Sequence, residues 1–487
     1  MTLSTEAQLK TLAREELIAV ATELLATVKL LQARVTELEV ELAKLRQPLA
    51  TSRNSSAPPS RDWKAGLPGR RRKKRGPPFG HERAVREWVD DPDRVIEAPV
   101  MRCSHCQADL RGVVPRTIGR RQLTELPEIR SLVIEPRQHE VVCPHCQHLE
   151  RGALPEGLEA ERAFGPRLEA TVVYLKHEQH LSYERTAAAL DALFGVEISE
   201  GGLGCILQRA GEAAQPQAAE IKQAVVQSQV ISSDETSARV GGQNWWHWVF
   251  VSAAGAYHTI EPTRSAQVIA GVMGEHEADC WVSDCYGPQL QAPAQRRQVC
   301  LAHQLRDLER CSQAQPQLRW AVEMQGLLRE AIHLRHRVEE LRPMGYQRRV
   351  VELENRLDAL LERRITGAMA VRLQKRFVKH RDHLLTFLHD LEVPAENNAC
   401  ERALRPSVIH RKVTNGFRSE WGARTYAAVQ TIIATTRQQG RHIFSTLVEL
   451  MGKQVLHGSV SILLYCNFKE SGDRMTYFFQ REEVPWY

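Results

Sequence analysis

The sequence lacks long apolar stretches, and none approaches the roughly 20 residues that a membrane-spanning helix requires. The longest candidate, residues 460–466, is far too short. The N-terminus is polar and charged, without the apolar segment of a secretion signal. Most of the eleven cysteines are scattered singly, which without such a signal indicates free thiols in a reducing compartment. We therefore expect a cytoplasmic protein with no membrane partner.

Charge is distributed unevenly along the chain. Residues 51–90 carry 11 Lys and Arg against 4 Asp and Glu, while the whole chain has a net charge of +6, so the remainder is close to neutral. Residues 47–90 are rich in Ser, Pro and Gly, and we expect a basic, disordered linker that serves as a DNA-binding arm. Its longest basic run is Arg70, Arg71, Arg72, Lys73, Lys74 and Arg75. A solubilising linker is the alternative.

The chain of 487 residues is long enough for two to four domains, and the first is a coiled coil over residues 6–46. Leucine recurs every seventh residue, at Leu17, Leu24, Leu31, Leu38 and Leu45. The residues at the preceding a positions include Val28 and Val35, and branched residues at a with leucine at d favour a parallel dimer. We expect a homo-oligomer through this leucine zipper rather than a helix packed on its own chain.

Two cysteine pairs predict a zinc-binding domain over residues 95–155. Cys103 and Cys106 form one C-x-x-C, and Cys143 and Cys146 form the second. Four thiolates complete a tetrahedral zinc site with no open position, which is typical of a structural zinc ribbon. A redox-active C-x-x-C is the alternative, but two copies in so short a span favour zinc.

Residues 161–220 are predicted to be helical, with helices at 182–194 and 200–214 around a turn at 195–199. A helix-turn-helix that binds DNA and ordinary helical packing both explain this pattern, and the sequence does not decide between them.

Residues 224–455 then change to the period of strands, with a helical insertion at about 304–392 and a C-terminal tail at 456–487. We predict strands at 225–231, 245–252, 257–262, 279–283 and 298–302. The first ends near Asp234 and the fourth ends at Asp284. Trp245, Trp246 and Trp248 are assigned to the sheet rather than to base stacking.

Carboxylates at these places suggest metal-dependent phosphodiester chemistry. Asp234 and Asp284 follow neighbouring strands, and two such residues can hold hard cations such as magnesium or manganese. A third carboxylate would come from a later helix, where Glu401 and Glu396 are candidates. The order of strands, acids and helix is that of a ribonuclease-H-like fold. Taken singly, each aspartate also suits a turn, and Glu401 suits a capping box after Asn398.

Basic residues around the last glutamate suit DNA phosphates. We assign DNA binding to Arg402, Arg405, Arg411 and Lys412. The alternative is a solvated helix face with pairs such as Glu401 with Arg405.

The order of these motifs resembles the insertion-sequence-66 family of bacterial transposases, from about residue 8 to residue 452. The motifs are the zipper, Asn54-Ser-Ser-x-Pro-Pro-Ser60, a basic stretch to Gly80-His81, the cysteine pairs, Asp234-Glu-Thr236, Trp248-Val-Phe-Val251, Ser283-Asp284-x-Tyr286, Ala302-His303-x-x-Arg306 and Asn397-Asn-Ala-Cys-Glu-Arg-Ala-Leu-Arg405. Cys400 stands where the family usually has alanine, and Gly287-Pro288 follow Tyr286 where a helix would start.

The resemblance implies a DNA transposase of an insertion sequence. It implies a ribonuclease-H-like core in which Asp234, Asp284 and Glu401 bind magnesium, cleave the element ends and direct strand transfer into target DNA. It also implies small accessory transposition proteins as partners. The whole would be an α+β multidomain protein, with an N-terminal coiled coil, a zinc ribbon and an α/β catalytic core with a helical insertion.

Two other functions also agree with part of the sequence. A tyrosine recombinase would use His303, Arg306 and a later tyrosine such as Tyr346, but would leave the acids unexplained. A zinc-ribbon DNA-binding regulator without catalysis would use the zipper, arm and zinc site, and would not need the α/β region.

Overall fold

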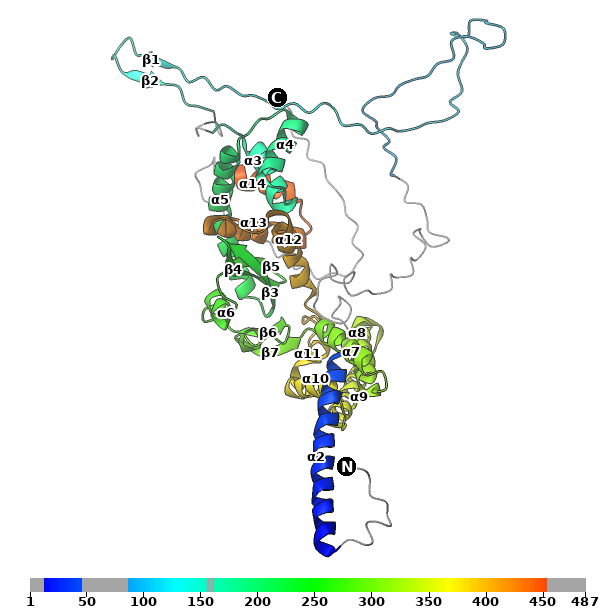
Figure 1. The fold of residues 1–487 in the computed structure, drawn as a ribbon. Helices are drawn as coiled ribbons and strands as arrows, with labels where there is room; N and C mark the ends of the chain where they lie inside the picture. Colours follow the sequence, from blue (N-terminus) through cyan, green and yellow to red (C-terminus); the bar gives the residue numbers. More distant parts are fainter. Residues whose placement is uncertain (1–12, 46–85, 156–157, 159–161, 453–487) are drawn as a thin grey trace.

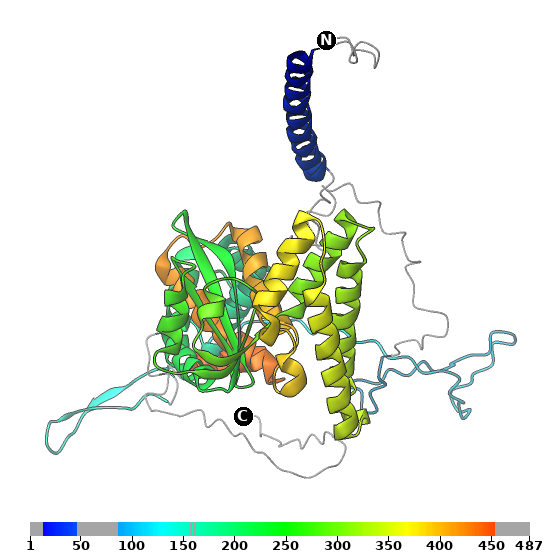
Figure 2. The same ribbon diagram turned by 90° about the horizontal axis from the view of Figure 1, so that it is seen from below.

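The structure is a computed structural model that describes residues 13–45, 86–155, 158 and 162–452. α2 (Arg14–Leu45) projects away from the rest of the molecule (Figures 1 and 2). Residues 86–155 are mostly extended chain and carry one short hairpin, β1 (Glu140–Val142) with β2 (Leu149–Arg151). The rest is a compact body of mixed α/β structure. No helix in the described part of the chain is both long and apolar enough to cross a bilayer.

A five-stranded mixed sheet in the order β5-β4-β3-β6-β7 lies at the centre of this body. β3, β4 and β5 form an antiparallel meander, whereas β6 and β7 continue the sheet on the other side of β3 and run parallel to it. From β3 to β7 the strands are Val230–Val240, Gln243–Ser252, Gly255–Glu261, Ala278–Ser283 and Ala294–Val299. β3 is therefore central and pairs on both sides.

Helices from both ends of the body cover the sheet. The helices before the sheet are α3 (Pro166–Val173), a π-helical turn (Tyr174–Glu178), α4 (Tyr183–Phe194) and α5 (Glu200–Val226). Two helical segments lie between strands, α6 (Ala266–Met273) and a 3-10 turn (Gln289–Gln291). The helices after the sheet are α12 (Asn398–Thr414), α13 (Glu420–Gln438) and α14 (Ile443–Gly452). α5 packs along α13, and α3 and α14 share a core with both. Segments at the two ends of the body thus build one layer.

Alternation along β4 shows how the two faces of the sheet differ. Trp248 and Phe250 pack with α6 and the end of α5, while Val249 and Val251 pack against α12. Successive side chains in a strand point to opposite faces, so a strand covered on both sides is apolar at successive positions. Asp234 pairs with Val249 in the register and therefore shares the face that α12 covers.

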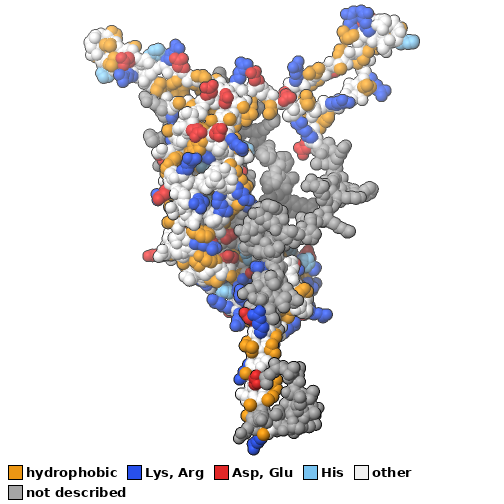
Figure 3. Space-filling view, viewed as in Figure 1, with side chains coloured by type: hydrophobic (Ala, Val, Ile, Leu, Met, Phe, Trp, Pro, Cys, Tyr) orange, Lys and Arg blue, Asp and Glu red, His pale blue; other side chains and the backbone are white. Residues whose placement is uncertain are grey.

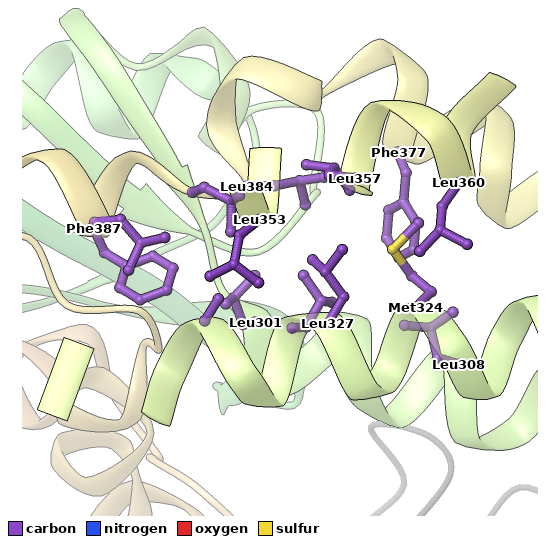
Figure 4. Close-up of a cluster of buried hydrophobic side chains, with 14 of the residues drawn as sticks. Leu301, Leu308, Met324, Leu327, Leu353, Leu357, Leu360, Phe377, Leu384 and Phe387 are labelled. Carbon is purple, nitrogen blue, oxygen red and sulfur yellow. The ribbon is translucent and has the colours of Figure 1, made fainter. Parts of the chain in front are cut away.

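The helical insertion forms a lobe with its own core. It contains α7 (Leu301–Ala314), α8 (Arg319–His336), a 3-10 turn (Val338–Glu340), α9 (Pro343–Glu362), α10 (Ala368–Lys379), a 3-10 turn (Arg381–His383) and α11 (Thr386–His389). Figure 4 shows the leucines, phenylalanines and methionine that fill it. Full burial of such a side chain contributes roughly 1.5–3 kcal/mol. Gln298 joins the lobe to β7, since its amide donates to the Leu384 carbonyl (3.1 Å) and accepts from the Phe387 N–H (3.1 Å).

The predicted elements agree with the structure except at two strands and at the end of one helix, because the helix predicted at 200–214 continues to Val226. The strand predicted at 225–231 is wrong at its start, because α5 continues to Val226 and β3 begins at Val230. The strand predicted at 298–302 lies too late, because β7 ends at Val299 and α7 begins at Leu301. α2 confirms the helix inside residues 6–46, and its self-association stays a prediction. Of the predicted arm at 47–90 only residues 86–90 are described, and the predicted tail at 456–487 lies entirely outside the described residues.

Candidate active site

Asp234 lies within β3 rather than past its end, which corrects the sequence-based placement. Antiparallel pairing with β4 keeps β3 extended to Val240, whereas the pairing with β6 ends at Ser232. One oxygen, Oδ1, accepts the N–H of Glu235 at 2.9 Å. Burial, then the charges of Glu235 and Asp284, raise the pKa of Asp234 to about 8, and Glu401 adds to the effect. Asp284 and Glu401 therefore lie close enough to disfavour the charge of Asp234.

Asp284 follows the last residue of β6, as predicted. Its Oδ1 accepts the backbone N–H of Tyr286 at 2.8 Å, so the loop after the strand folds back onto the carboxylate. The Tyr286 hydroxyl in turn donates to the carbonyl of Arg264 at 3.0 Å. These bonds fix the position of Asp284 through its own loop.

A buried carboxylate on the opposite face anchors the same loop. Glu235 accepts two bonds, from Arg264 Nε (2.8 Å) and from Gln289 Nε2 (2.6 Å). Its pKa is nevertheless raised, chiefly by burial and also by the charge of Asp284. Arg264 also stacks on Tyr286, with its guanidinium carbon 3.7 Å from the ring centroid, and lies over Trp246 at 4.7 Å. We name Glu235, Arg264 and Gln289 the loop anchor. Sequence reasoning missed it, although Glu235 next to an acid on a buried strand was the available signal.

Glu401 lies in the first turn of α12, but it does not form a capping box. Asn397 is the N-cap, and Glu401 is the fourth helical residue, one position too far for that motif. Its Oε1 instead pairs with Arg306 Nη2 of α7 at 3.0 Å, and His303 Nε2 lies 3.9 Å away. The ion partner of Glu401 is thus Arg306, and not Arg405 as in the alternative of a solvated helix face.

His303 and Arg306 thus belong to the surroundings of the candidate acids. Burial, then the charge of Arg306, lowers the pKa of His303, and its Nδ1 has no hydrogen-bond partner among the described residues. The tyrosine that a recombinase would need is elsewhere. Tyr346 is buried in the helical lobe, and its hydroxyl donates to the carbonyl of Leu388 at 3.0 Å. Nothing in this arrangement favours a tyrosine nucleophile.

The start of α12 is fixed directly to the sheet. Asn397 donates its side-chain N–H to the Ser233 carbonyl at 2.8 Å and its backbone N–H to Cys300 Sγ at 3.1 Å. Cys400 is buried against β4, and burial raises its pKa well above its usual value, so it is a packing residue. Glu396, the second candidate acid, accepts a bond from the side-chain amide of Asn398.

The predicted DNA-binding residues of α12 differ in their surroundings. Arg402, Arg405 and Lys412 are exposed. Arg411 is half-buried and donates to the carbonyl and hydroxyl of Ser237, so it also fastens α12 to β3.

The two cysteine pairs form similar turns but are not brought together. After each pair a glutamine adopts a left-handed backbone, Gln107 with φ 63° and Gln147 with φ 59°. Backbone N–H groups, chiefly those of Cys106 and Cys146, lower the pKa of Cys103 and Cys143. Within the described ranges, no group of three or more His, Cys, Asp or Glu side chains is arranged to hold a metal. This holds for the four thiols and also for the three acids.

Comparison with known proteins decides the family. Residues 161–425, more than half of the chain, match the model of the transposase IS66 family. The chain belongs to this family. It is also 24% identical over 418 residues to the uncharacterized protein y4hP of Sinorhizobium fredii (strain NBRC 101917 / NGR234), covering 74% of this chain and 72% of that protein. An IS66 family transposase acts on DNA, so DNA is the partner that the fold must accommodate. The matched region contains the sheet, the helical lobe and all three acids.

Proposed function

We propose that this IS66 transposase cleaves the ends of its element and joins them to target DNA at Asp234, Asp284 and Glu401. The convergence of these acids carries the proposal. They come from the middle of β3, the end of β6 and the first turn of α12. Burial and the charge of Glu235 are the main causes of the raised pKa of Asp234, yet the charges of Asp284 and Glu401 also contribute to it. These three elements are far apart in the sequence, so local folding alone does not bring their carboxylates together.

A ribonuclease-H-like core is part of this proposal. The strand order, with an antiparallel meander on one side of β3 and two parallel strands on the other, supports it. β3 and β6 are adjacent and parallel, and Asp234 shares the face that α12 covers, which supports a site formed with Asp284 at the end of β6.

Carboxylate oxygens are the ligands that magnesium and manganese prefer, so the chemistry of the three acids fits such an ion. When bound, a divalent ion would activate water and stabilise the leaving oxygen of a phosphodiester. Asp234 and Asp284 would be the ligands from the sheet. Glu401 would be the third, on release from Arg306, which holds it in the structure. Water and then a 3′ hydroxyl of DNA are the attacking groups, so no covalent bond joins protein and DNA.

The other parts would hold the DNA and assemble the complex. Arg402, Arg405 and Lys412 follow Glu401 on α12, where exposed cations suit phosphates. The basic arm would add sequence-independent affinity. α2 would pair protomers, the cysteines would bind zinc, and small accessory proteins would be further partners.

The test compares Glu401→Ala with its neighbour Glu396→Ala in one nicking assay on DNA carrying the element's ends. Asp234→Ala, Asp284→Ala and Glu401→Ala should each lower the rate by several orders of magnitude, since each removes a proposed ligand. Glu396→Ala should retain most activity, and end binding should survive in all four.

Three outcomes would contradict the proposal. Activity in Glu401→Ala together with inactivity in Glu396→Ala would exclude Glu401 as the third acid. Cleavage in the presence of a chelator would exclude metal catalysis. A covalent protein–DNA adduct after denaturation would indicate a tyrosine nucleophile.

A further inference from the structure

α10 presents an uncompensated basic face to solvent. Its 12 residues, Ala368–Lys379, contain four basic residues and no acid. Arg372, Lys375 and Lys379 are exposed. They recur at intervals of three and four, so they lie on one side of the helix. We call these three residues the α10 basic face.

The surroundings of these cations differ from those of an ordinary solvated helix. None of the three forms an ion pair or hydrogen bond with another residue in the described ranges, whereas Arg376 on the same helix pairs with Asp307 at 2.7 Å. α9, which precedes it, mixes basic residues with four acids, Glu352, Glu354, Asp358 and Glu362. Like charges one turn apart repel each other, so the α10 basic face is costly unless an anion covers it.

The opposite side of α10 is fixed in the core of the lobe. Ala370, Leu373 and Phe377 are buried, and the ring of Phe377 lies 6.3 Å from that of Trp320. The amide of Gln374 donates to the carbonyl of Arg363 at 2.7 Å and so caps the end of α9. The basic face is therefore carried on a rigid support, and a ligand need order only the side chains.

The same lobe reaches the candidate active site. Asp307, the partner of Arg376, follows Arg306, which pairs with Glu401. α10 and the third acid are thus both fastened to α7. Lys and Arg side chains are frequent over the lower part of the body in Figure 3, where Figure 1 places this lobe.

We propose that the α10 basic face binds the phosphate backbone of duplex DNA beside the active site. From Arg372 to Lys379 the helix rises about 10 Å, which spans roughly three phosphates of one strand. The contacts are to backbone only, because lysine and arginine without a fixed carboxylate or base partner read charge rather than sequence. Which DNA is bound, the element or its target, rests on the proposed function. Binding of duplex DNA to the α10 basic face does not depend on that proposal.

The test measures affinity for a duplex by fluorescence anisotropy over a range of salt concentrations, in a chelator so that no cleavage occurs. The variant is Arg372→Gln with Lys375→Gln and Lys379→Gln. The matched control is Arg342→Gln with Arg348→Gln and Arg349→Gln, which removes the same charge from exposed sites on or next to α9. Circular dichroism should show both variants folded, since all six side chains are exposed.

In the α10 variant the slope of log Kd against log salt should fall by about 2–3, at roughly 0.9 per lost phosphate contact. The loss should be equal for an end sequence and an unrelated duplex, and the control should keep the slope of the unchanged protein. An unchanged slope in the α10 variant, or an equal fall in both variants, would overturn the proposal. Nicking at saturating DNA separates this result from the catalytic proposal, because the α10 variant should still cut.

Discussion

Asp234 and Glu235 are adjacent in the chain but act on opposite faces of the sheet. A strand turns successive side chains to opposite sides, so Asp234 faces α12 while Glu235 faces the loop anchor. One strand thereby supplies a candidate ligand and also fixes the loop of Asp284. A shift of one residue in the register of β3 would exchange the two roles.

Five histidines form a buried group that includes two residues on the face of the sheet that α12 covers, His247 and His258. The five are His177, His180, His247, His258 and His410. His247 contacts Ser407 Oγ at 2.7 Å through one ring nitrogen and His258 at 3.0 Å through the other. The ring of Tyr426 lies 4.7 Å from that of His410. Burial lowers the pKa of His258 to about 3, and burial with the charge of Lys176 does the same for His410. These rings are therefore neutral in the folded protein.

This group predicts loss of stability in acid. The unfolded chain takes up a proton on each ring near pH 6.5, whereas His258 and His410 in the fold do so only near pH 3. The unfolded state then binds more protons in this window, so folding stability falls as the pH is lowered from about 6.5 to about 3. By pH 4.5 each such ring should cost about 2–3 kcal/mol.

Urea unfolding at several pH values measures this dependence. His258→Asn should flatten it, because one buried titrating ring is removed. His333→Asn, at an exposed site on α8, should leave it unchanged. An equal slope in His258→Asn and in the unchanged protein would contradict the assignment.

At the scale of elements, helix ends with side-chain caps were predictable from sequence. Ser182 and Ser199 accept the backbone N–H of Arg185 and Gly202, and Gly195 adopts φ 60° at the end of α4. The confirmed two-helix pattern still leaves a helix-turn-helix and ordinary packing open. Local chemistry marks these boundaries, so residue types alone locate them.

Boundaries set by distant contacts were not predictable. Val225 and Val226 look like strand residues, but they end α5 because they pack beneath the sheet with Trp248. The polar residues around Asp234 suggested a strand end, yet pairing with β4 keeps β3 extended to Val240. The partner of Glu401 lies 95 residues away, and no local pattern indicates it.

The two cysteine turns predict a metal-dependent element. Zinc should draw them together, and purified protein should contain about one zinc per chain. Cys103→Ser and Cys143→Ser should each abolish that content in metal analysis. Cys205→Ser, at an exposed site outside both turns, should not. Full zinc content in either of the first two variants would exclude the four-cysteine site.

At the scale of the whole molecule, α2 is a helix with its apolar side chains in solvent. Leu24 is 55% exposed and Leu31 is 58% exposed, and Val28 and Val35 between and beyond them are also exposed. Exposed leucines at heptad spacing are covered in a parallel dimer. Leu24→Lys with Leu31→Lys should therefore convert an oligomer of the full chain to a monomer, as measured by light scattering.

The control for this prediction places the same charges on the other side of α2. Ala26→Lys with Ala33→Lys are at the outer heptad positions and should leave the mass unchanged. A monomeric unchanged protein, or loss of the oligomer in both variants, would contradict a zipper.

The packing of α5 against α13 also affects when α5 can be covered during synthesis of the chain. α13 begins 194 residues after α5 ends, so the ribosome makes the helix that covers α5 long after α5 itself. At about 5–20 residues per second the interval is roughly 10–40 s. During this interval the apolar side of α5 is exposed to chaperones. α12, which carries Glu401, is made only near the end of the interval. A nascent chain that stops short of α12 therefore contains Asp234 and Asp284 but not Glu401, and under the proposed mechanism it could not yet cut DNA.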